Sequence, residues 1–165
     1  MKKNKIIQII GENYSGSYKT TRYACRGVVI QDNKILLSYE TKVDQWMLPG
    51  GGREVGESNT DCVIRELSEE TGYIVVPEKE MVEVIEYYES VRYVTLYFLC
   101  RIVGETVPHL TEGEKKEGLE RWWLPIDDAL LIFSKHENYR NIFEEQRGLY
   151  LREYSALMEI TNDIL

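Results

Sequence analysis

Short runs of β-branched and aromatic residues alternate with polar turns over the first third of the chain, a pattern that predicts β-strands. The expected strands are Lys5–Ile10, Tyr23–Ile30, Ile35–Tyr39 and Trp46–Leu48. Turn-forming residues 31–34 (QDNK) separate the second and third strands, so these two strands are predicted to form a hairpin.

The rest of the chain mixes helical and strand patterns. Residues Asn59–Thr71 have helical spacing and stop at Gly72, a common helix C-terminal signal. Residues 104–118 are predicted to form a polar loop, and a helix is expected to begin at Pro125. The remaining expected elements are strands Tyr73–Val76, Val82–Tyr88, Tyr93–Val103 and Trp122–Leu124, and a long amphipathic helix, Tyr139–Leu165. Without strict alternation of strands and helices, this order predicts an α+β fold, or a mixed sheet packed by helices.

Length and composition narrow the class of protein. A chain of 165 residues with 43% hydrophobic residues predicts a single domain, 1–165, with a core that needs no disulfide or metal to fold. The three cysteines, Cys25, Cys62 and Cys100, form no Cys-x-x-Cys pair and lie far from both histidines, which argues against a zinc site. We expect reduced, buried thiols.

The net charge of -8 makes an unfavourable surface for polyanions, so we expect no nucleic-acid polymer as partner. A small phosphorylated ligand stays compatible, provided that cations lie in its site. The apolar stretch within Met1–Ile10 is too short for a signal peptide or membrane span, and no later segment is long enough. The sequence therefore predicts a soluble, cytoplasmic protein without membrane contact.

The segment with candidate chemistry begins with a glycine-rich loop. Gly50, Gly51, Gly52 and Gly56 are four glycines within seven positions, directly before the predicted helix 59–71. Glycine loses more backbone entropy on folding than any other residue, so this density indicates unusual dihedral angles or a close approach of the backbone to another group.

The helix after this loop carries Arg65, Glu66, Glu69 and Glu70. Glu66 lies three and four positions from the other two acids, and each such like-charge pair costs about 0.2–0.5 kcal/mol. The helix dipole also disfavours anions in the last turn. A solvated acidic face leaves both costs unexplained, whereas a bound divalent cation removes both, because Mg²⁺ and Mn²⁺ prefer carboxylate oxygens. We therefore interpret this segment as a metal-binding helix.

These residues resemble the Nudix box, residues 51–73 here. The matching positions are Gly51, Glu57, Arg65, Glu66, Leu67, Glu69, Glu70 and Gly72. The only departure is Tyr73, where the family usually has an aliphatic residue. So many matched positions are a far more specific signal than a short glycine motif. The resemblance covers roughly Tyr23 to Leu130 and implies the Nudix (MutT-like) hydrolase family, whose fold is a mixed β-sheet sandwiched between helices.

The resemblance also implies roles for individual residues. Glu66, Glu69 and Glu70, with a backbone carbonyl of Gly50 or Gly51, would bind Mg²⁺ or Mn²⁺. Arg65 would orient the neighbouring carboxylates through charge-assisted hydrogen bonds, and Glu57 would fix the loop. The implied reaction is metal-dependent hydrolysis of a phosphoanhydride bond in a nucleoside diphosphate linked to another moiety.

A carboxylate must accept the proton of the attacking water. Family members use either a box glutamate, here Glu66, or a glutamate on a loop outside the box. We favour Glu117, with Glu120 second, because such an acid often precedes the tryptophan that matches Trp122. The other two loop acids are Glu112 and Glu114.

The sequence leaves the substrate open. Five aromatic residues are candidates to stack on a base, although most such side chains belong to cores: Trp46, Tyr87, Tyr88, Tyr93 and Trp122. The second hypothesis is a catalytically silent Nudix-fold module that binds a nucleotide, but such modules typically lose box acids and none is lost here. The third is an acidic structural domain. An apolar face on the C-terminal helix would support a homodimer.

Overall fold

The computed structural model describes residues 4–165, so the first three residues of the Met1–Ile10 segment lie outside the described residues. A five-stranded sheet in the order β1-β7-β8-β2-β6 forms its largest layer. Its strands are β1 (Lys5–Ile10), β2 (Thr20–Val28), β6 (Gly50–Gly52), β7 (Tyr73–Tyr88) and β8 (Val91–Glu105). Strand β1 runs parallel to β7 and β2 parallel to β8, while β7 and β8 are antiparallel, so the sheet is mixed.

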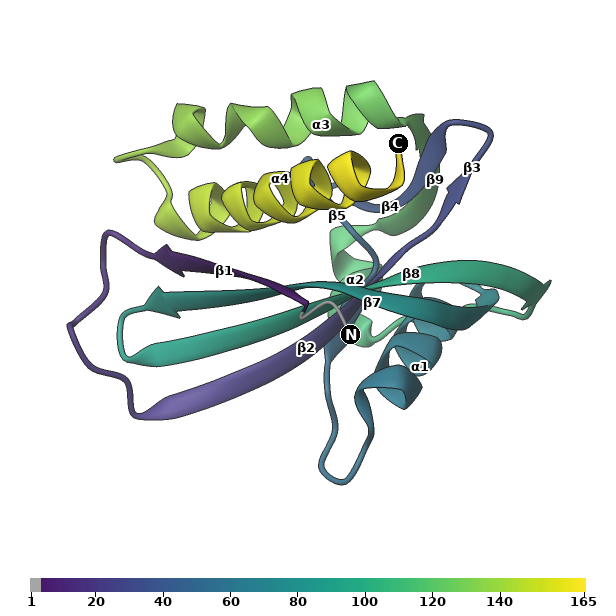
Figure 1. Cartoon of the computed structure of the whole chain (residues 1–165), viewed down its shortest axis with the longest axis horizontal. Coiled ribbons are helices and arrows are strands. Elements are labelled where there is room, and N and C mark those ends of the chain that lie inside the picture. The colour runs from purple at the N-terminus through teal and green to yellow at the C-terminus, as the bar shows by residue number, and fades with distance from the viewer. Residues whose placement is uncertain (1–3) are drawn as a thin grey trace.

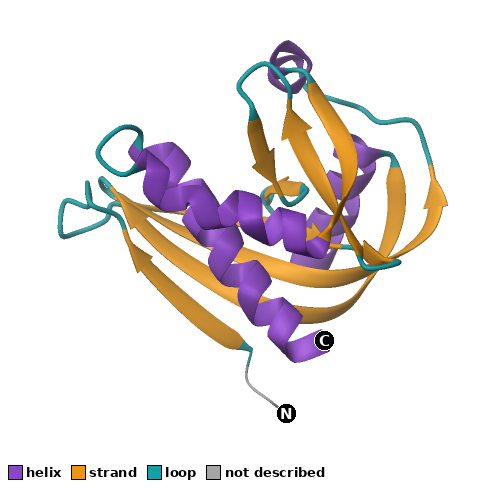
Figure 2. Ribbon diagram, turned by 90° about the horizontal axis from the view of Figure 1, so that it is seen from above, coloured by secondary structure: helices purple, strands orange, loops and turns teal. Residues whose placement is uncertain are grey.

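A smaller antiparallel sheet is built around β4, which pairs with β3, β5 and β9. Its strands are β3 (Ile30–Gln31), β4 (Lys34–Glu40), β5 (Gln45–Met47) and β9 (Leu119–Pro125). Figure 2 shows this sheet to one side of the long, curved strands of the large sheet. The chain passes from the small sheet back to the large one at the glycines of β6, and these glycines begin the candidate site.

Helices cover the strands from two sides (Figure 1). Helices α3 (Ile126–Ser134) and α4 (Glu144–Ile164) lie on one side, and α1 (Asn59–Thr71) lies on the other. A short helix, α2 (Glu112–Glu117), and a 3-10 helix, η1 (Lys135–Tyr139), complete the described elements. This arrangement confirms the predicted α+β fold with a mixed sheet between helices. No described helix is long and apolar enough to cross a membrane.

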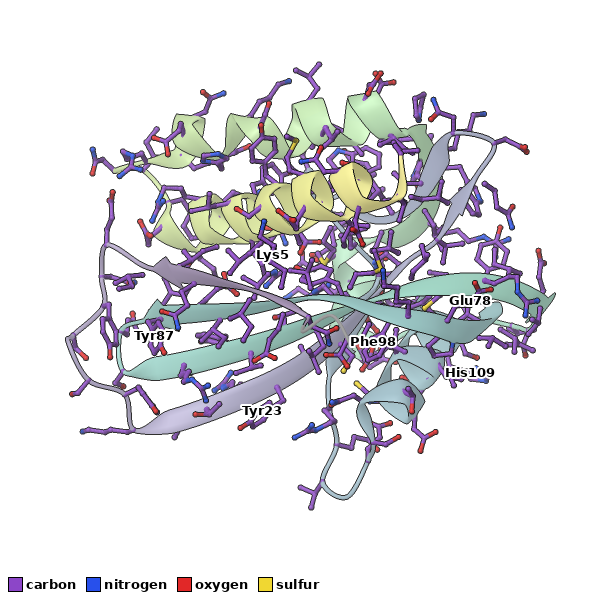
Figure 3. The ribbon with its side chains drawn as sticks, viewed as in Figure 1. Lys5, Tyr23, Glu78, Tyr87, Phe98 and His109 are labelled. Atoms are coloured by element: carbon purple, nitrogen blue, oxygen red, sulfur yellow. The ribbon has the colours of Figure 1, made fainter. Side chains whose placement is uncertain are left out.

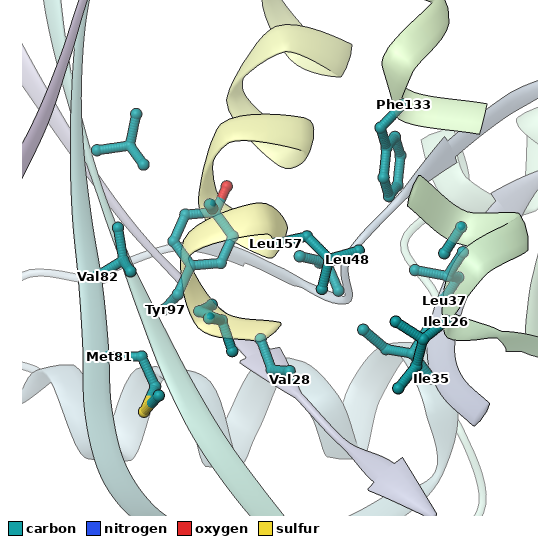
Figure 4. Packing of buried hydrophobic residues seen from close by; sticks show 14 of the residues in the cluster. Val28, Ile35, Leu37, Leu48, Met81, Val82, Tyr97, Ile126, Phe133 and Leu157 are labelled. Carbon is teal, nitrogen blue, oxygen red and sulfur yellow. The ribbon is translucent and has the colours of Figure 1, made fainter. Parts of the chain in front are cut away.

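Two hydrophobic cores hold these layers together. The larger core packs α3 and α4 against both sheets and includes Val28, Leu37, Leu48, Tyr97 and Leu157, all fully buried (Figure 4). The smaller core packs α1 against the large sheet and includes the three free cysteines, all buried as expected. Each core uses one face of the large sheet, because side chains alternate between faces along a strand.

Two predicted strands are one strand in the structure. β7 runs continuously over residues 73–88, with register irregularities near Pro77, and does not stop between Val76 and Val82 as predicted. A proline removes a backbone donor, which an interior strand position cannot tolerate. β1 pairs only with residues 82–87 of β7, so the edge beside Pro77 faces no strand and the proline fits.

Three further predictions about elements are corrected. The predicted hairpin of residues 23–30 and 35–39 is confirmed only next to its turn, where Ile30 pairs with Ile35 and Gln31 with Lys34, because β2 belongs to the large sheet. The predicted loop 104–118 contains α2, which has a capping box between Thr111 and Glu114. The C-terminal helix begins at Glu144 and not at Tyr139, since η1 and a turn precede it. Local capping and pairing, which periodicity does not reveal, decide all three.

Candidate active site

Helix α1 presents the box acids because both of its ends and its apolar face are fixed. The Ser58 hydroxyl accepts a hydrogen bond from the Asp61 amide (3.1 Å), which caps the N-terminus. Gly72 ends the helix at φ 73°, where a Cβ would meet the Thr106 carbonyl oxygen at 2.5 Å, so no other residue fits. Val63 and Leu67 are fully buried in the smaller core, which holds the acidic face in a set direction.

The glycine loop packs its backbone directly on two of these acids. The amide of Gly50 donates a hydrogen bond to Glu70 Oε2 at 3.1 Å. A Cβ on Gly50 would lie 2.2 Å from the carbonyl oxygen of Cys25. A Cβ on Gly51 would lie 2.6 Å from the Glu66 carboxyl carbon, so this glycine leaves room for that carboxylate. The density of glycines predicted unusual dihedral angles or a close approach of the backbone to another group, and the structure has both: Gly50 and Gly56 have positive φ, and Gly51 lies against the Glu66 carboxylate.

Arg65 joins three carboxylates into what we call the box cluster, Glu57, Arg65, Glu66 and Glu69. Its guanidinium donates to Glu57 Oε1 (2.7 Å), Glu66 Oε1 (2.9 Å) and Glu69 Oε2 (3.2 Å). It also donates to the Gly52 carbonyl oxygen (3.0 Å), which ties the loop to the helix. The hydrogen bond from Arg65 lowers the pKa of Glu57 from 4.5 to about 2. One arginine thus relieves part of the repulsion among the acids.

Glu70 lies apart from this cluster in a buried setting. Only 8% of the residue is exposed, and its Oε2 accepts hydrogen bonds from the Ser38 hydroxyl and the Gly50 amide, both at 3.1 Å. Burial raises its pKa to about 8, and the charge of Arg26 only partly offsets this effect. Burial also raises the pKa of Glu66. Both acids would gain from a nearby positive charge that Arg65 and Arg26 do not fully supply.

These donors fit a divalent cation by their chemistry. The buried Glu70 and the half-buried Glu66 lie one helical turn apart, and the loop backbone beside them adds carbonyl oxygens. In the part of the chain that the structure describes, no three Asp, Glu, His or Cys side chains are already gathered around one point. Glu69 has a side chain that is 40% exposed and bonded to Arg65. If all three glutamates bound a cation, the carboxylates of Glu66 and Glu69 would therefore give up their hydrogen bonds with Arg65.

The four loop acids have different surroundings. Glu112 pairs with Lys115, and Glu120 accepts a hydrogen bond from the Trp122 indole at 3.0 Å. The charge of Glu114 raises the pKa values of both Glu66 and Glu70, whereas the charge of Glu117 raises that of Glu40. The side chain of Glu114 also accepts a hydrogen bond from the Thr111 amide (2.8 Å). Glu114 of α2, and not the favoured Glu117, therefore contributes weakly to the raised pKa values of these two box acids.

The five candidate aromatic residues are divided among three places. Tyr88 and Tyr93 line a cavity of about 340 Å³ that also includes Glu86 and Arg152 of α4. The ring of Trp46 is stacked on that of Tyr39. Trp122 is 45% exposed, and its ring contacts Trp46 edge-on. Tyr87 packs with Tyr14 and Tyr18. Figure 3 shows Tyr87 near the opposite end of the large sheet from His109, whose amide bonds to the C-terminal end of α1.

Sequence reasoning missed two polar residues next to the box acids. Ser38 interrupts the apolar run of β4, and this single hydroxyl among leucines was a readable signal. Arg26 lies opposite Gly50 in the pairing of β2 with β6, and its Nη1 donates to the Leu48 carbonyl oxygen at 2.6 Å. Only the pairing of strands far apart in sequence brings Arg26 to the glycine loop.

The model of the NUDIX domain family matches residues 21–146. The chain belongs to the Nudix family. Among curated Nudix relatives, the putative ADP-ribose pyrophosphatase YjhB of Bacillus subtilis is 29% identical over 123 residues, which cover 70% of this chain but only 55% of that protein. An RNA pyrophosphohydrolase of Dinoroseobacter shibae is 32% identical over 124 residues and covers 70% of this chain and 71% of its own. The chain thus spans little more than half of YjhB.

Solved structures of other proteins agree with the fold. A NUDIX hydrolase from Nitrosomonas europaea has a TM-score of 0.58 at 24% identity and covers 82% of this chain and 89% of its own. A UDP-X diphosphatase has a TM-score of 0.56 at 23% identity, with 86% and 66% covered. At this identity the likeness shows the fold alone, so the substrate has to be argued from this chain's own residues.

Proposed function

We propose that the protein is a metal-dependent pyrophosphohydrolase that cleaves a phosphoanhydride bond in a nucleoside diphosphate linked to another moiety. The observation that carries this proposal is the complete set of box acids, gathered around Arg65 and around the glycine-loop amide of Gly50. An acidic structural domain would gain nothing from burying Glu70 beside Glu66, because burial and like charge both raise the free energy of the ionised form.

The relatives support the reaction more than the substrate. YjhB is named a putative ADP-ribose pyrophosphatase, and another relative, 28% identical, is a mouse diphosphoinositol polyphosphate phosphohydrolase. Their names differ in the attached groups and share hydrolysis at linked phosphates. We therefore carry over to this chain only the cleavage of a phosphoanhydride bond. The binding place of the nucleoside is proposed from the cavity at Tyr88 and Tyr93.

We assign the following roles to the residues of the site. Glu66, Glu69, Glu70 and the Gly50 carbonyl would hold Mg²⁺ or Mn²⁺, which supplies the positive charge that neutralises the diphosphate and acidifies a bound water. Arg65 orients the carboxylates, and Glu57 anchors the loop through Arg65 and the Glu54 amide (2.9 Å). A glutamate accepts the proton of the attacking water; Glu117 is the favoured base, and Glu114 is a further candidate because its charge contributes to the raised pKa values of Glu66 and Glu70.

The cavity at Tyr88 and Tyr93 is our candidate for the nucleoside. A volume of about 340 Å³ is within the range of small-molecule sites. Tyr93 lies opposite Arg22 in the register of β2 with β8, and Arg26 lies opposite Gly50. The four steps along the strand from Arg22 to Arg26 span roughly 13 Å at 3.3 Å per residue. A ribosyl diphosphate is long enough to join the two places.

The decisive experiment is a substrate panel with Mg²⁺ and with Mn²⁺. It should cover nucleoside triphosphates, ADP-ribose, dinucleoside polyphosphates, NADH and nucleotide sugars, with Glu70→Gln as the paired variant. We expect turnover of one class and a loss of about 1000-fold in the variant, because metal-assisted charge stabilisation is worth several kcal/mol. Glu117→Gln and Glu114→Gln, assayed on the same substrate, identify the base by the larger fall in kcat.

The same panel tests the alternative of a silent nucleotide-binding module. Tight Mn²⁺ binding without turnover of any substrate would favour that module over the hydrolase. Wild-type metal affinity in Glu69→Gln and Glu70→Gln would favour an acidic structural domain instead. Each of the three hypotheses therefore predicts its own combination of metal binding and turnover.

The cellular location and the oligomeric state are also proposals. We propose a cytoplasmic location, which three free, buried cysteines support because reducing compartments keep thiols unpaired. The homodimer was predicted from an apolar face on the C-terminal helix. In the structure this face of α4 packs on the chain's own core through residues such as Tyr150, Leu157 and Ile160, so it no longer supports a homodimer. Sedimentation of the full chain measures its oligomeric state.

A further inference from the structure

The backbone just before the glycine loop is held by hydrogen bonds from three directions. The Leu48 amide donates to Glu153 Oε2 at 2.5 Å, and Arg26 donates to the Leu48 carbonyl oxygen at 2.6 Å. The Gly27 amide donates to the Pro49 carbonyl oxygen at 2.8 Å. The next amide, that of Gly50, bonds to Glu70. This segment is therefore clamped between α4, β2 and the box acid.

Glu153 is the unusual member of this clamp because it is a fully buried carboxylate, 0% exposed, on a helix. Its Oε1 accepts hydrogen bonds from the Tyr97 hydroxyl and from Arg152 Nε (2.9 Å), and Arg152 Nη1 lies 3.7 Å from Glu86. We call Glu86, Tyr97, Arg152 and Glu153 the α4 cluster. Figure 4 shows the Tyr97 hydroxyl pointing toward α4 and Leu48 beside Leu157 of that helix.

Burying an ionised carboxylate costs several kcal/mol of desolvation, and hydrophobic residues of similar volume often fill such a place with no loss of stability. A requirement for stability alone therefore does not explain an acid at this position. Glu153 does, however, reach a backbone amide 105 residues away in the chain, two residues before Gly50. A backbone N–H needs an acceptor when buried, and no other acceptor for the Leu48 amide is present among the described contacts.

We propose that Glu153 is a positioning residue that fixes the Leu48–Gly50 backbone, so that the carboxyl-terminal helix sets the geometry of the candidate metal site. Its effect on catalysis rests on the proposed function, whereas its effect on the loop does not. Residue 153 lies beyond residues 21–146, which the family model matches. The contact that holds the backbone before the box thus comes from outside the matched region. It runs from Glu153 to the Leu48 amide, and the backbone continues to Gly50, whose amide bonds to Glu70.

Three variants of the full chain separate positioning from core stability. Glu153→Met removes the acceptor for the Leu48 amide. Tyr97→Phe removes another hydrogen bond of the same carboxylate but leaves the loop contact, so it is the matched control. Glu153→Gln keeps an amide oxygen that can accept from Leu48, so it should restore what Met loses.

The readout is the affinity for Mn²⁺ alone, titrated by electron paramagnetic resonance at a temperature where the variants are folded. We expect Kd for Mn²⁺ to rise at least tenfold in Glu153→Met and less than threefold in Tyr97→Phe and Glu153→Gln. With a substrate in hand, kcat should fall in Glu153→Met while KM changes little. Wild-type affinity in a folded Glu153→Met, or equal losses in the Met and Phe variants, would overturn the proposal.

Native-state hydrogen exchange of the wild-type chain gives a test that needs neither a variant nor activity. The amides of Leu48 and Gly50 should open with the same free energy as the α4 amides of Leu157 and Ile160. Fast exchange at Leu48 and Gly50 while α4 stays protected would show that the loop is independent of the helix and would overturn the proposal. If wild-type protein binds no Mn²⁺, the proposed function fails, and this exchange measurement still decides the role of Glu153.

Discussion

The box cluster and the α4 cluster are both networks of arginine and glutamate, yet they differ in sequence distance and in exposure. The box cluster joins residues 57–69 at the surface, where the side chain of Arg65 is 23% and that of Glu69 40% exposed. The α4 cluster joins strands β7 and β8 to α4, and Glu153 is fully buried. Surface ion pairs contribute little to folding, whereas breaking a buried pair is costly.

The difference suggests a division of tasks. The box cluster has polar groups that solvent and a ligand can reach, so its loss should mainly affect chemistry. The α4 cluster is largely buried, so its loss should mainly affect stability; the exceptions are the loop contact of Glu153 and the part of Glu86 and Arg152 that lines the cavity at Tyr88 and Tyr93, where the Arg152 side chain is 13% exposed.

Arg152→Met should lower the free energy of unfolding by about 3–5 kcal/mol, because it leaves Glu86 and Glu153 buried without their ion-pair partner. Urea denaturation followed by circular dichroism measures the loss. Arg101→Met is the control, since Arg101 pairs with Glu78 at the surface and should cost less than about 1 kcal/mol. Equal costs for the two variants would contradict the distinction between the clusters.

Arg65→Met should lower kcat of the proposed reaction by about 100-fold, comparable to the loss of one preorganised donor in an active site. The reason is that Glu57, Glu66 and Glu69 lose the guanidinium that orients them. Arg53→Met, in the loop before α1, removes contacts to Asn59 and Tyr23 but none to the box acids, so it should stay within about threefold of wild type. If the two variants fall alike, Arg65 does not orient the site.

Gly51→Ala should lower kcat by about tenfold while the midpoint of thermal unfolding changes little. The new methyl group would lie 2.6 Å from the Glu66 carboxylate, which is the mobile end of a side chain and has to move aside. At Gly52 a Cβ meets nothing within 4 Å, which makes Gly52→Ala the matched control. Activity unchanged in both variants would show that the position of Glu66 is not critical.

The smallest expected effect is a pH dependence of stability from the Glu57–Arg65 pair. The hydrogen bond from Arg65 lowers the pKa of Glu57 from 4.5 to about 2 in the folded protein. The folded state therefore favours the ionised form, and its stabilisation is present above pH 4.5 and is lost as the pH falls toward 2. Denaturation midpoints at pH 5.5 and pH 3 should differ more in wild type than in Glu57→Gln; an equal difference would contradict this.

Local sequence patterns were enough to predict the elements that contain the box. The helix 59–71, its end at Gly72 and the close approach of the glycine backbone to another group all depend on residues within about twenty positions of one another, and the structure has all three. The predicted single strand between Trp46 and Leu48 is β5, which runs over Gln45–Met47. The predictions for the pairing partners of β2 and for the continuity of β7 were wrong, because both features depend on residues far away in the chain.

The sequence by itself determined the family, the α+β class and the identity of the box acids, because a motif of short spacing on one helix needs no knowledge of distant contacts. The tertiary structure decided the surroundings of each acid. It buried Glu70 against Ser38 and Gly50, and it placed Glu153 within hydrogen-bond distance of the Leu48 amide. The physical reason is that desolvation, charge and hydrogen bonding depend on distance in space, and only the folded chain sets those distances.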